Sequence, residues 1–227
     1  MDKLNEAYQI LDQIKEETNQ EKILEGATQA FSKSPLCVEA ATILSKLNSH
    51  FSEKENILIT CLSSLVNEIE NNKNIKIFDN LNKARFELGS LYYDYGMNKK
   101  ALLLFNSLEK DDSTLPIKYK LMVIYAILEE DIIDSYYNEH IKKANDIDYV
   151  RLSFTYMIYK YKKANFRDVR ELFININMKN PMLIKAINDE IDSENSLEAK
   201  EAYKILRNNS LLINSCPNIL NYLKTIY

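Results

Sequence analysis

Few residues in this sequence could support catalysis or bind a metal. Histidine, a common acid–base catalyst and metal ligand, occurs only as His50 and His140. Neither lies near a cysteine or a carboxylate cluster at the spacing of a metal site. Cys37, Cys61 and Cys216 are odd in number and widely spaced, which indicates neither a disulfide framework nor a zinc site. We expect no metal, no cofactor and no Cys–His nucleophile, with the histidines on the surface or at helix ends.

Two acidic clusters, Asp111-Asp112 and Glu129-Glu130-Asp131, offer the remaining candidate chemistry. Paired carboxylates can act as general acid and base, but acidic residues also gather at helix ends, where they interact with the helix dipole. We expect the helix-end role, with paired-carboxylate catalysis as the alternative. A phosphate-binding glycine loop is excluded, because the chain has only 3 scattered Gly. The sequence therefore predicts that the protein is not an enzyme.

The composition favours long helices joined by short polar turns. Of the 227 residues, 46% are hydrophobic, so the chain can bury a sizeable core. It has only 3 Gly and 4 Pro, too few for the turns of a β-sandwich or an α/β enzyme. Apolar residues recur at spacings of three and four, as in Leu4, Ala7, Tyr8, Leu11 and Ile14, and in Leu88, Leu91, Tyr92 and Tyr95. We expect an all-α fold of about twelve or thirteen helices, mostly in antiparallel pairs, in one domain over residues 1–227.

Prolines and capping residues predict where helices begin. Proline is tolerated at the first helical position, and the prolines here are Pro35, Pro116, Pro181 and Pro217. Ser34 and Asn180 precede two of them as candidate N-caps. Capping-box spacings occur at Thr18 and Glu21, Ser52 and Glu55, and Asn195 and Glu198. These pairs predict helix starts near residues 19, 53 and 196.

Charge and hydropathy exclude two classes of partner. The formal charge is −4 and the pI is about 5.4, with basic and acidic residues interspersed. We therefore expect no nucleic-acid partner, which would need a basic surface. The longest apolar run, Leu121 to Leu128, is less than half the ~20 residues that a spanning helix needs, so we expect no membrane insertion. The start of the chain lacks a signal peptide, and the unpaired cysteines favour a reducing compartment, so a cytoplasmic location is expected.

The clearest motif pairs small and aromatic residues at fixed spacing. Its six residues are Leu88, Gly89, Tyr92, Gly96, Ala101 and Phe105. Gly89 would let one helix touch the next closely, and Gly96 would end the first helix in a conformation that disfavours side chains. Ala101 and Phe105 would interlock the two helices as a small and a large residue.

This motif resembles the tetratricopeptide-repeat family. The register continues, with Leu121 and Tyr125 lying 33 residues after Leu88 and Tyr92, and Leu152 and Tyr156 lying 31 further on. The resemblance implies an α-solenoid of about six antiparallel helix pairs in a right-handed superhelix. It places the best repeat at 82–115 and capping helices at about 196–227, and it assigns Tyr92, Tyr125 and Tyr156 to the core.

A narrower resemblance concerns the junction near the N-terminus. The segment Ser34-Pro35-Leu36-Cys37-Val38-Glu39-Ala40 is similar to a Ser-Pro-x-Cys-x-x-Ala junction in bacterial tetratricopeptide proteins of the suppressor-of-tumorigenicity-like group. It implies a bacterial origin and no enzymatic activity.

The family resemblance also implies a concave binding face on the first helix of each pair. The binding residues that it places there are Phe86, Ser90, Tyr93, Asp94, Tyr119, Val123, Phe154 and Met157, with Ala126 and Val150 beside them. This set is unusually apolar for a water-facing surface, and soluble monomers seldom leave such a surface bare. The face is therefore expected either to bind a peptide or helix or to be covered by a helix of this chain or of a second copy.

Three functions follow from these two alternatives. The first is a non-enzymatic interaction scaffold that binds a protein or peptide partner on the concave face. The second is a regulator that responds to a peptide, and the third is a structural protein that self-associates, for example as a homodimer. The C-terminal segment, Ile213 to Tyr227, is apolar enough to cover the face, although we expect it to cap the end of the array.

Overall fold

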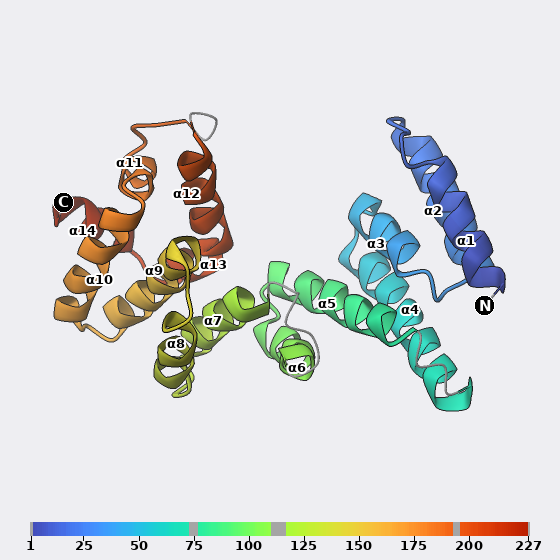
Figure 1. Cartoon of the computed structure of the whole chain (residues 1–227), viewed down its shortest axis with the longest axis horizontal. Coiled ribbons are helices and arrows are strands. Elements are labelled where there is room, and N and C mark those ends of the chain that lie inside the picture. Colours follow the sequence, from blue (N-terminus) through green and yellow to red (C-terminus); the bar gives the residue numbers. More distant parts are fainter. Residues whose placement is uncertain (1, 73–76, 110–116, 193–195, 227) are drawn as a thin grey trace. The chain divides into compact units, whose positions relative to one another are not determined.

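The computed structural model describes residues 2–72, 77–109, 117–192 and 196–226, and the described residues form fourteen α-helices and no strand (Figure 1). The prediction of an all-α fold is confirmed. The chain divides into two compact units, Met1–Leu115 and Pro116–Tyr227. They are called the N-terminal unit and the C-terminal unit. The single domain and the right-handed solenoid stay predictions, and Asp111-Asp112 lies outside the described residues.

The N-terminal unit consists of helices that pack on their neighbours in sequence (Figure 1). They are α1 (Asp2–Gln13), α2 (Gln20–Lys33), α3 (Val38–Leu47), α4 (Phe51–Asn72), α5 (Phe78–Asp94) and α6 (Asn98–Glu109). In addition, α3 contacts α5 directly, although α4 lies between them in sequence. The first helices of the second and third pairs therefore lie side by side.

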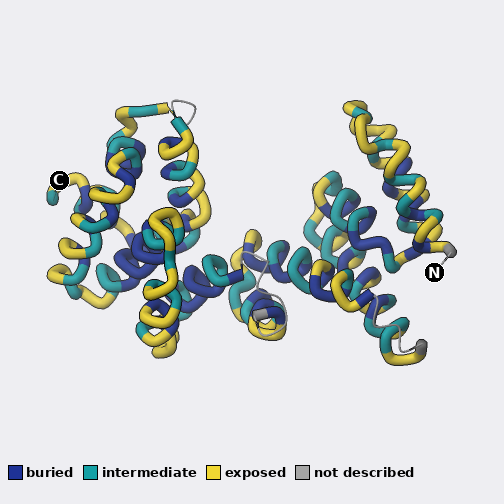
Figure 2. The backbone as a smooth tube through the Cα atoms, viewed as in Figure 1, coloured by how far each residue is buried: buried dark blue, intermediate teal, exposed yellow. Residues whose placement is uncertain are grey.

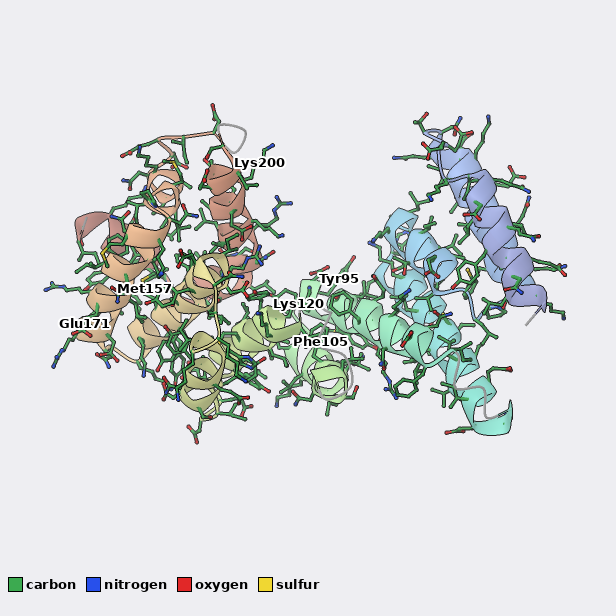
Figure 3. The ribbon with its side chains drawn as sticks, in the orientation of Figure 1. Tyr95, Phe105, Lys120, Met157, Glu171 and Lys200 are labelled. Atoms are coloured by element: carbon green, nitrogen blue, oxygen red, sulfur yellow. The ribbon has the colours of Figure 1, made fainter. Side chains whose placement is uncertain are left out.

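The α5–α6 pair has the geometry that its motif predicts. A Cβ atom on Gly89 would lie 2.7 Å from Cε1 of Phe105, so glycine is what allows the close helix contact. Gly96 has a φ of +70°. The Gly96 amide donates to the Tyr93 carbonyl at 3.0 Å and the Met97 amide donates to the Tyr92 carbonyl at 2.8 Å, the two hydrogen bonds of a Schellman motif. Phe105, labelled in Figure 3, is fully buried.

The C-terminal unit has more irregular helices. They are α7 (Ile117–Leu128), α8 (Ile133–Ile141), α9 (Asp146–Lys162), α10 (Phe166–Lys179), α11 (Met182–Ile187), α12 (Leu197–Asn208), α13 (Ser210–Asn214) and α14 (Ile219–Thr225). Helices α7 to α12 each pack on the next, α7 also packs on α9, and α14 packs on α11. The short helix α13 returns to contact both α7 and α9.

Helices α7 and α9 form the centre of the C-terminal unit. Every residue from Leu121 to Ala126 is buried, and so is every residue from Leu152 to Tyr159, so neither stretch has a solvent-facing side (Figure 2). A helix that is buried all round needs partners on all sides, and α8, α10 and α13 supply them around α9. The tyrosines predicted to be core residues, Tyr92, Tyr125 and Tyr156, are buried in their own units.

Several predicted helix starts are shifted by a few residues. Asn19, one residue after Thr18, caps α2 by accepting from the amides of Glu21 and Lys22. Ser34 ends α2 instead of capping the next helix, and α3 begins only at Val38. The α12 start is close to the prediction, because the Ser196 hydroxyl accepts from the Ala199 amide. Pro116 and Asn195 lie outside the described residues.

Within the part of the chain that the structure describes, no helix is both long enough and apolar enough to cross a bilayer.

Candidate functional site

An apolar groove lies between α3 and α5 in the N-terminal unit. Its volume is about 400 Å³, which is in the range of ligand-binding clefts. We call it the α3–α5 groove, and its lining residues are Val38, Glu39, Thr42, Ile43, Lys83, Phe86 and Glu87. Thr42, Ile43 and Phe86 are half-buried, so part of each side chain faces the open groove.

Backbone spacing explains how these side chains come together. Glu39, Thr42 and Ile43 recur at three- and four-residue intervals along α3, as do Lys83 and Phe86 along α5, so each set shares one helix face. The opposite sides of the same helices carry the core. The Phe86 ring is held from behind by Phe105, with the ring centroids 6.0 Å apart.

A polar network closes one edge of the groove. The Tyr8 hydroxyl donates to Oε2 of Glu39 at 2.7 Å, and Nδ2 of Asn80 donates to the Tyr8 oxygen at 3.3 Å. Nζ of Lys83 lies 3.6 Å from Oε1 of Glu39. Burial, together with the hydrogen bond to Glu39, raises the pKa of Tyr8. The Tyr8 hydroxyl therefore stays protonated and keeps donating to Glu39.

The other carboxylate of the groove, Glu87, has no hydrogen-bond or ion-pair partner among the residues that the structure describes. Its side chain is half-buried at the groove wall. Glu39 and Glu87 against Lys83 give the lining a formal charge of −1. The groove therefore combines apolar walls with one carboxylate whose charge is not balanced.

In the N-terminal unit, the predicted binding residues have different surroundings. Phe86 lines the groove, and Asp94 is exposed at the end of α5. Ser90 is half-buried, and its hydroxyl oxygen is buried with no hydrogen-bond partner among the described atoms. Tyr93 is buried, with 7% of its surface exposed, and burial raises its pKa. Tyr93 is therefore a packing residue of this unit, because its ring has too little accessible surface to contact a partner.

In the C-terminal unit, the predicted open face is filled. Val123, Phe154 and Met157 (the last labelled in Figure 3) are buried, and Ala126 and Val150 are buried beside them. The expectation that these side chains face an open groove is corrected here. They are core residues because the chain folds back over α7 and α9 through α13, whose Leu212 is fully buried.

Specific polar contacts attach this cover to α9. Nη2 of Arg151 donates to Oε2 of Glu201 on α12 at 2.8 Å, and Nε of Arg151 donates to the other carboxylate oxygen. The Thr155 hydroxyl donates to Oδ1 of Asn209 at 2.8 Å, and both side chains are buried. The hydrogen bonds to Glu201 raise the pKa of Arg151. Of the two explanations for the apolar face, coverage by the same chain therefore applies in this unit.

Tyr119, the remaining predicted residue, belongs to a charged network. Its hydroxyl donates to Oδ1 of Asp148, and Nζ of Lys118 donates to Oδ2 of the same carboxylate at 2.8 Å. Lys118 and Arg151 both lie over its ring, at 4.9 and 5.1 Å from the centroid. Half-buried and bonded in this way, Tyr119 serves packing within the C-terminal unit.

The histidines, the cysteines and the Glu129-Glu130-Asp131 cluster do not come together in one site. His50 precedes α4, and His140 lies in the last turn of α8 against the Tyr136 ring, so both are at helix ends as predicted. The three cysteines are buried as free thiols. Glu129 follows α7 and pairs with Lys162 and Lys163. Among the described residues, no three His, Cys, Asp or Glu side chains gather as a metal site would require.

Sequence reasoning missed the α3 wall of the groove. The motif register extends from α5 to α9, so α3 was not assigned to the binding face. A signal was present, because Val38–Leu47 is apolar beyond one stripe. Ala40, Ala41 and Leu44 are buried in the core, while Ile43 is left for a second surface. The charged groove residues Glu39, Lys83 and Glu87 have no motif and could not be identified from sequence.

Two further hollows lie in the C-terminal unit and suit a ligand less well. One, of about 520 Å³, is lined by Asp146, Tyr149, Asn175, Met178 and Lys179, and the Lys179 ammonium already pairs with Asp146. The other is smaller, at about 240 Å³, and lies between α10 and the end of α14. The α3–α5 groove has a more apolar lining than the first of these hollows and a larger volume than the second.

A scan of the sequence against models of known protein families gives no match, and a search of curated proteins gives none either.

Proposed function

We propose that this protein is a non-enzymatic interaction module whose α3–α5 groove binds an apolar segment of a peptide or partner protein. The observation that carries this proposal is the half-buried wall of Thr42, Ile43 and Phe86 in an open groove of about 400 Å³. An aromatic side chain in such a position is typical of binding hot spots, because a ligand can desolvate its remaining surface.

The wider classification forms part of the same proposal. A tetratricopeptide-type repeat protein is supported by the Gly89–Phe105 contact and by the left-handed residue that ends α5. The same backbone conformation recurs at Glu129 after α7 and at Ala164 after α9. A cytoplasmic location and a bacterial origin go with this classification. The role is passive, with a preformed surface that selects a partner by shape and charge.

Peptide selection against a blocked groove tests the proposal. A random peptide library is panned on the immobilised full chain, with counter-selection on Thr42→Arg, which places a long side chain in the groove without removing a core residue. We expect clones whose affinity falls at least about tenfold on Thr42→Arg and on Phe86→Ala, measured by fluorescence anisotropy. Thr28→Arg, on the exposed part of α2, is the matched control and should bind like the wild type.

Two outcomes would contradict the proposal. Clones that bind wild type and Thr42→Arg equally would show that the groove is not the binding surface. Light scattering coupled to size exclusion supplies the other test, because a monomer has a mass of 26.5 kDa. A dimer that Thr42→Arg dissociates would show that a second copy occupies the groove, and the protein would then be a self-associating one.

A further inference from the structure

The motif register places Glu87 and Arg151 at equivalent positions on their helices. Glu87 directly precedes Leu88 on α5, and Arg151 directly precedes Leu152 on α9. Both leucines are buried in their units, as the register requires. Residues at one register position present their side chains in the same direction from a helix. The two units can therefore be compared at this position. In the C-terminal unit the face of α9 is covered, and in the N-terminal unit the face of α5 lines an open groove.

In the covered unit, the charge at this position is matched by the cover. Arg151 binds both oxygens of Glu201, which comes from α12, the helix that leads directly into α13. Bidentate guanidinium–carboxylate pairs fix orientation as well as adding attraction. The apolar contact comes from α13, where Leu212 is fully buried. The cover thus consists of an apolar anchor and an opposite charge on adjoining segments.

In the open unit, the sign of the charge is reversed. Glu87 is a half-buried carboxylate that neither an ion pair nor a hydrogen bond satisfies in the described part of the chain. Lys83, one helical turn before it, is directed to Glu39 at 3.6 Å. A ligand that fills the groove without a cation would remove water from an unpaired carboxylate, which carries a desolvation cost. A cation beside the apolar anchor offsets that cost through its attraction to the carboxylate.

We propose that the groove selects segments in which an arginine or lysine adjoins an apolar side chain, with Glu87 as the residue that recognises the cation. The apolar side chain packs against Phe86 and Ile43, and the cation binds the Glu87 carboxylate. This inference rests on the proposed function, because it names the ligand class of the same groove. The occupant to which we commit is a separate polypeptide with a basic flank, since its cation complements the Glu87 carboxylate and its apolar side chain complements the groove wall.

Three displayed peptide sub-libraries test the charge preference. They share leucine and phenylalanine anchors and differ only in the flanking residues, which are arginine or lysine, glutamine, or glutamate. On the wild-type full chain, we expect the basic sub-library to be enriched over the acidic one. On Glu87→Lys the preference should reverse, and individual basic peptides should lose about tenfold in affinity. On Glu87→Gln the basic preference should weaken without reversing.

A matched control separates a local charge effect from a global one. Glu16→Lys makes the same charge change at an exposed turn residue outside the groove, and it should keep the wild-type preference. Salt gives a second measurement, because basic peptides should bind more weakly at higher ionic strength on wild type and respond less on Glu87→Gln. Thermal unfolding of each variant, followed by circular dichroism, confirms that it is folded.

The possible failures are distinguishable. If no peptide discriminates wild type from Thr42→Arg, the proposed function fails and the charge preference fails with it. If peptides do discriminate these two, but basic and acidic flanks bind equally to wild type and to Glu87→Lys, the charge inference alone is overturned. If the protein forms a dimer that Glu87→Lys dissociates, the occupant is a second copy of this chain. That result would overturn the assignment to a different protein or peptide.

Discussion

At the residue scale, two glycines lie in helices where a neighbouring side chain takes the space of a Cβ atom. A Cβ on Gly89 would lie 2.7 Å from Cε1 of Phe105, a rigid ring that is fully buried. A Cβ on Gly26 would lie equally close to Cγ2 of Ile14, but Ile14 is half-buried and follows the end of α1. The same distance is therefore expected to have different consequences, because Ile14 is partly exposed in a turn whereas Phe105 is enclosed on all sides.

Alanine at these two positions should act in opposite directions. Gly89→Ala should destabilise the protein by about 1 kcal/mol, because overpacking of ~1–3 kcal/mol outweighs the gain of ~1 kcal/mol in helix propensity. Gly26→Ala should be neutral or stabilising, because Ile14 can shift and the propensity gain remains. Urea unfolding of each variant measures both effects: the midpoint of the transition should shift, while the slope of the unfolding free energy against urea concentration should stay unchanged. Equal destabilisation would show that Phe105 is no more constrained than Ile14.

At the element scale, a recurring feature is the left-handed residue that ends four helices. Gly96 ends α5, and Glu129, Ala164 and Asp189 do the same for α7, α9 and α11 with φ values of 55° to 58°. After each, the next amide reaches back to a carbonyl in the last turn, as the Asn165 amide does to Lys160 at 2.9 Å. Three of these positions therefore hold a side chain in a conformation that favours glycine.

Glycine at one of these helix ends should stabilise the C-terminal unit. Ala164→Gly removes a Cβ atom from a left-handed residue and should raise the free energy of unfolding by about 1 kcal/mol. Gly96→Ala makes the reverse change at the same type of helix end, and its new Cβ would meet nothing within 4 Å, so conformation alone should lower stability by a similar amount. Urea unfolding of both variants checks the pair, and changes of the same sign would refute it.

Sequence patterns predicted elements better than they predicted surfaces. The helical class, the Gly89–Phe105 contact and the Gly96 terminus followed from local spacing, because each depends on residues within one helix pair. The open or covered state of a helix face depends on distant segments. Phe154 and Met157 were predicted as binding residues, with coverage by a helix as the alternative; α13 packs on their helix, and nothing near them in sequence decides between the two. Glu87 was missed because a lone carboxylate on a helix carries no pattern.

At the scale of the whole molecule, tyrosine–carboxylate–lysine groups join helices in both units. In each, a tyrosine hydroxyl donates to a carboxylate that also binds a lysine. Besides Tyr8, Glu39 and Lys83 at the groove, such groups are Tyr92, Glu55 and Lys100, then Tyr119, Asp148 and Lys118, then Tyr156, Asp134 and Lys160. The hydrogen bond from Tyr92 holds the pKa of Glu55 below its usual value. For Asp134, burial opposes this effect, but the bonds from Lys160 and Tyr156 outweigh it and lower its pKa.

These groups predict losses of stability at both extremes of pH. A carboxylate with a lowered pKa in the folded state stabilises the fold above its unfolded pKa of ~4, and this contribution is lost as the pH falls through the folded pKa. Burial and the neighbouring carboxylates raise the pKa of Tyr92 and of Tyr156 to about 12. Their contribution is complete below the unfolded pKa of ~10 and is lost as the pH rises towards the folded value.

The midpoint of urea unfolding, measured between pH 3 and pH 12, gives the dependence of stability on pH. We expect a plateau near neutral pH for the wild type. In Tyr156→Phe the midpoint should fall less steeply at both acidic and alkaline pH, because that variant loses the bond to Asp134 and one titrating phenol. Tyr95→Phe is the control, since Tyr95 is exposed and its hydroxyl donates no hydrogen bond to a carboxylate in the described part of the chain. An unchanged profile in Tyr156→Phe would show that the group does not contribute to pH-dependent stability.

The return of α13 to α7 and α9 also affects how the chain folds during synthesis. In the N-terminal unit, each helix meets partners that are close in sequence, so that unit can fold once α6 has left the ribosome. In the C-terminal unit, α7 and α9 emerge well before α13, with α10 to α12 still to be made. The apolar faces of α7 and α9 remain exposed to solvent until α13 is made, and exposed apolar surface on a nascent chain favours aggregation and chaperone binding. The synthesis of α13 therefore sets the earliest time at which α7 and α9 can complete their packing.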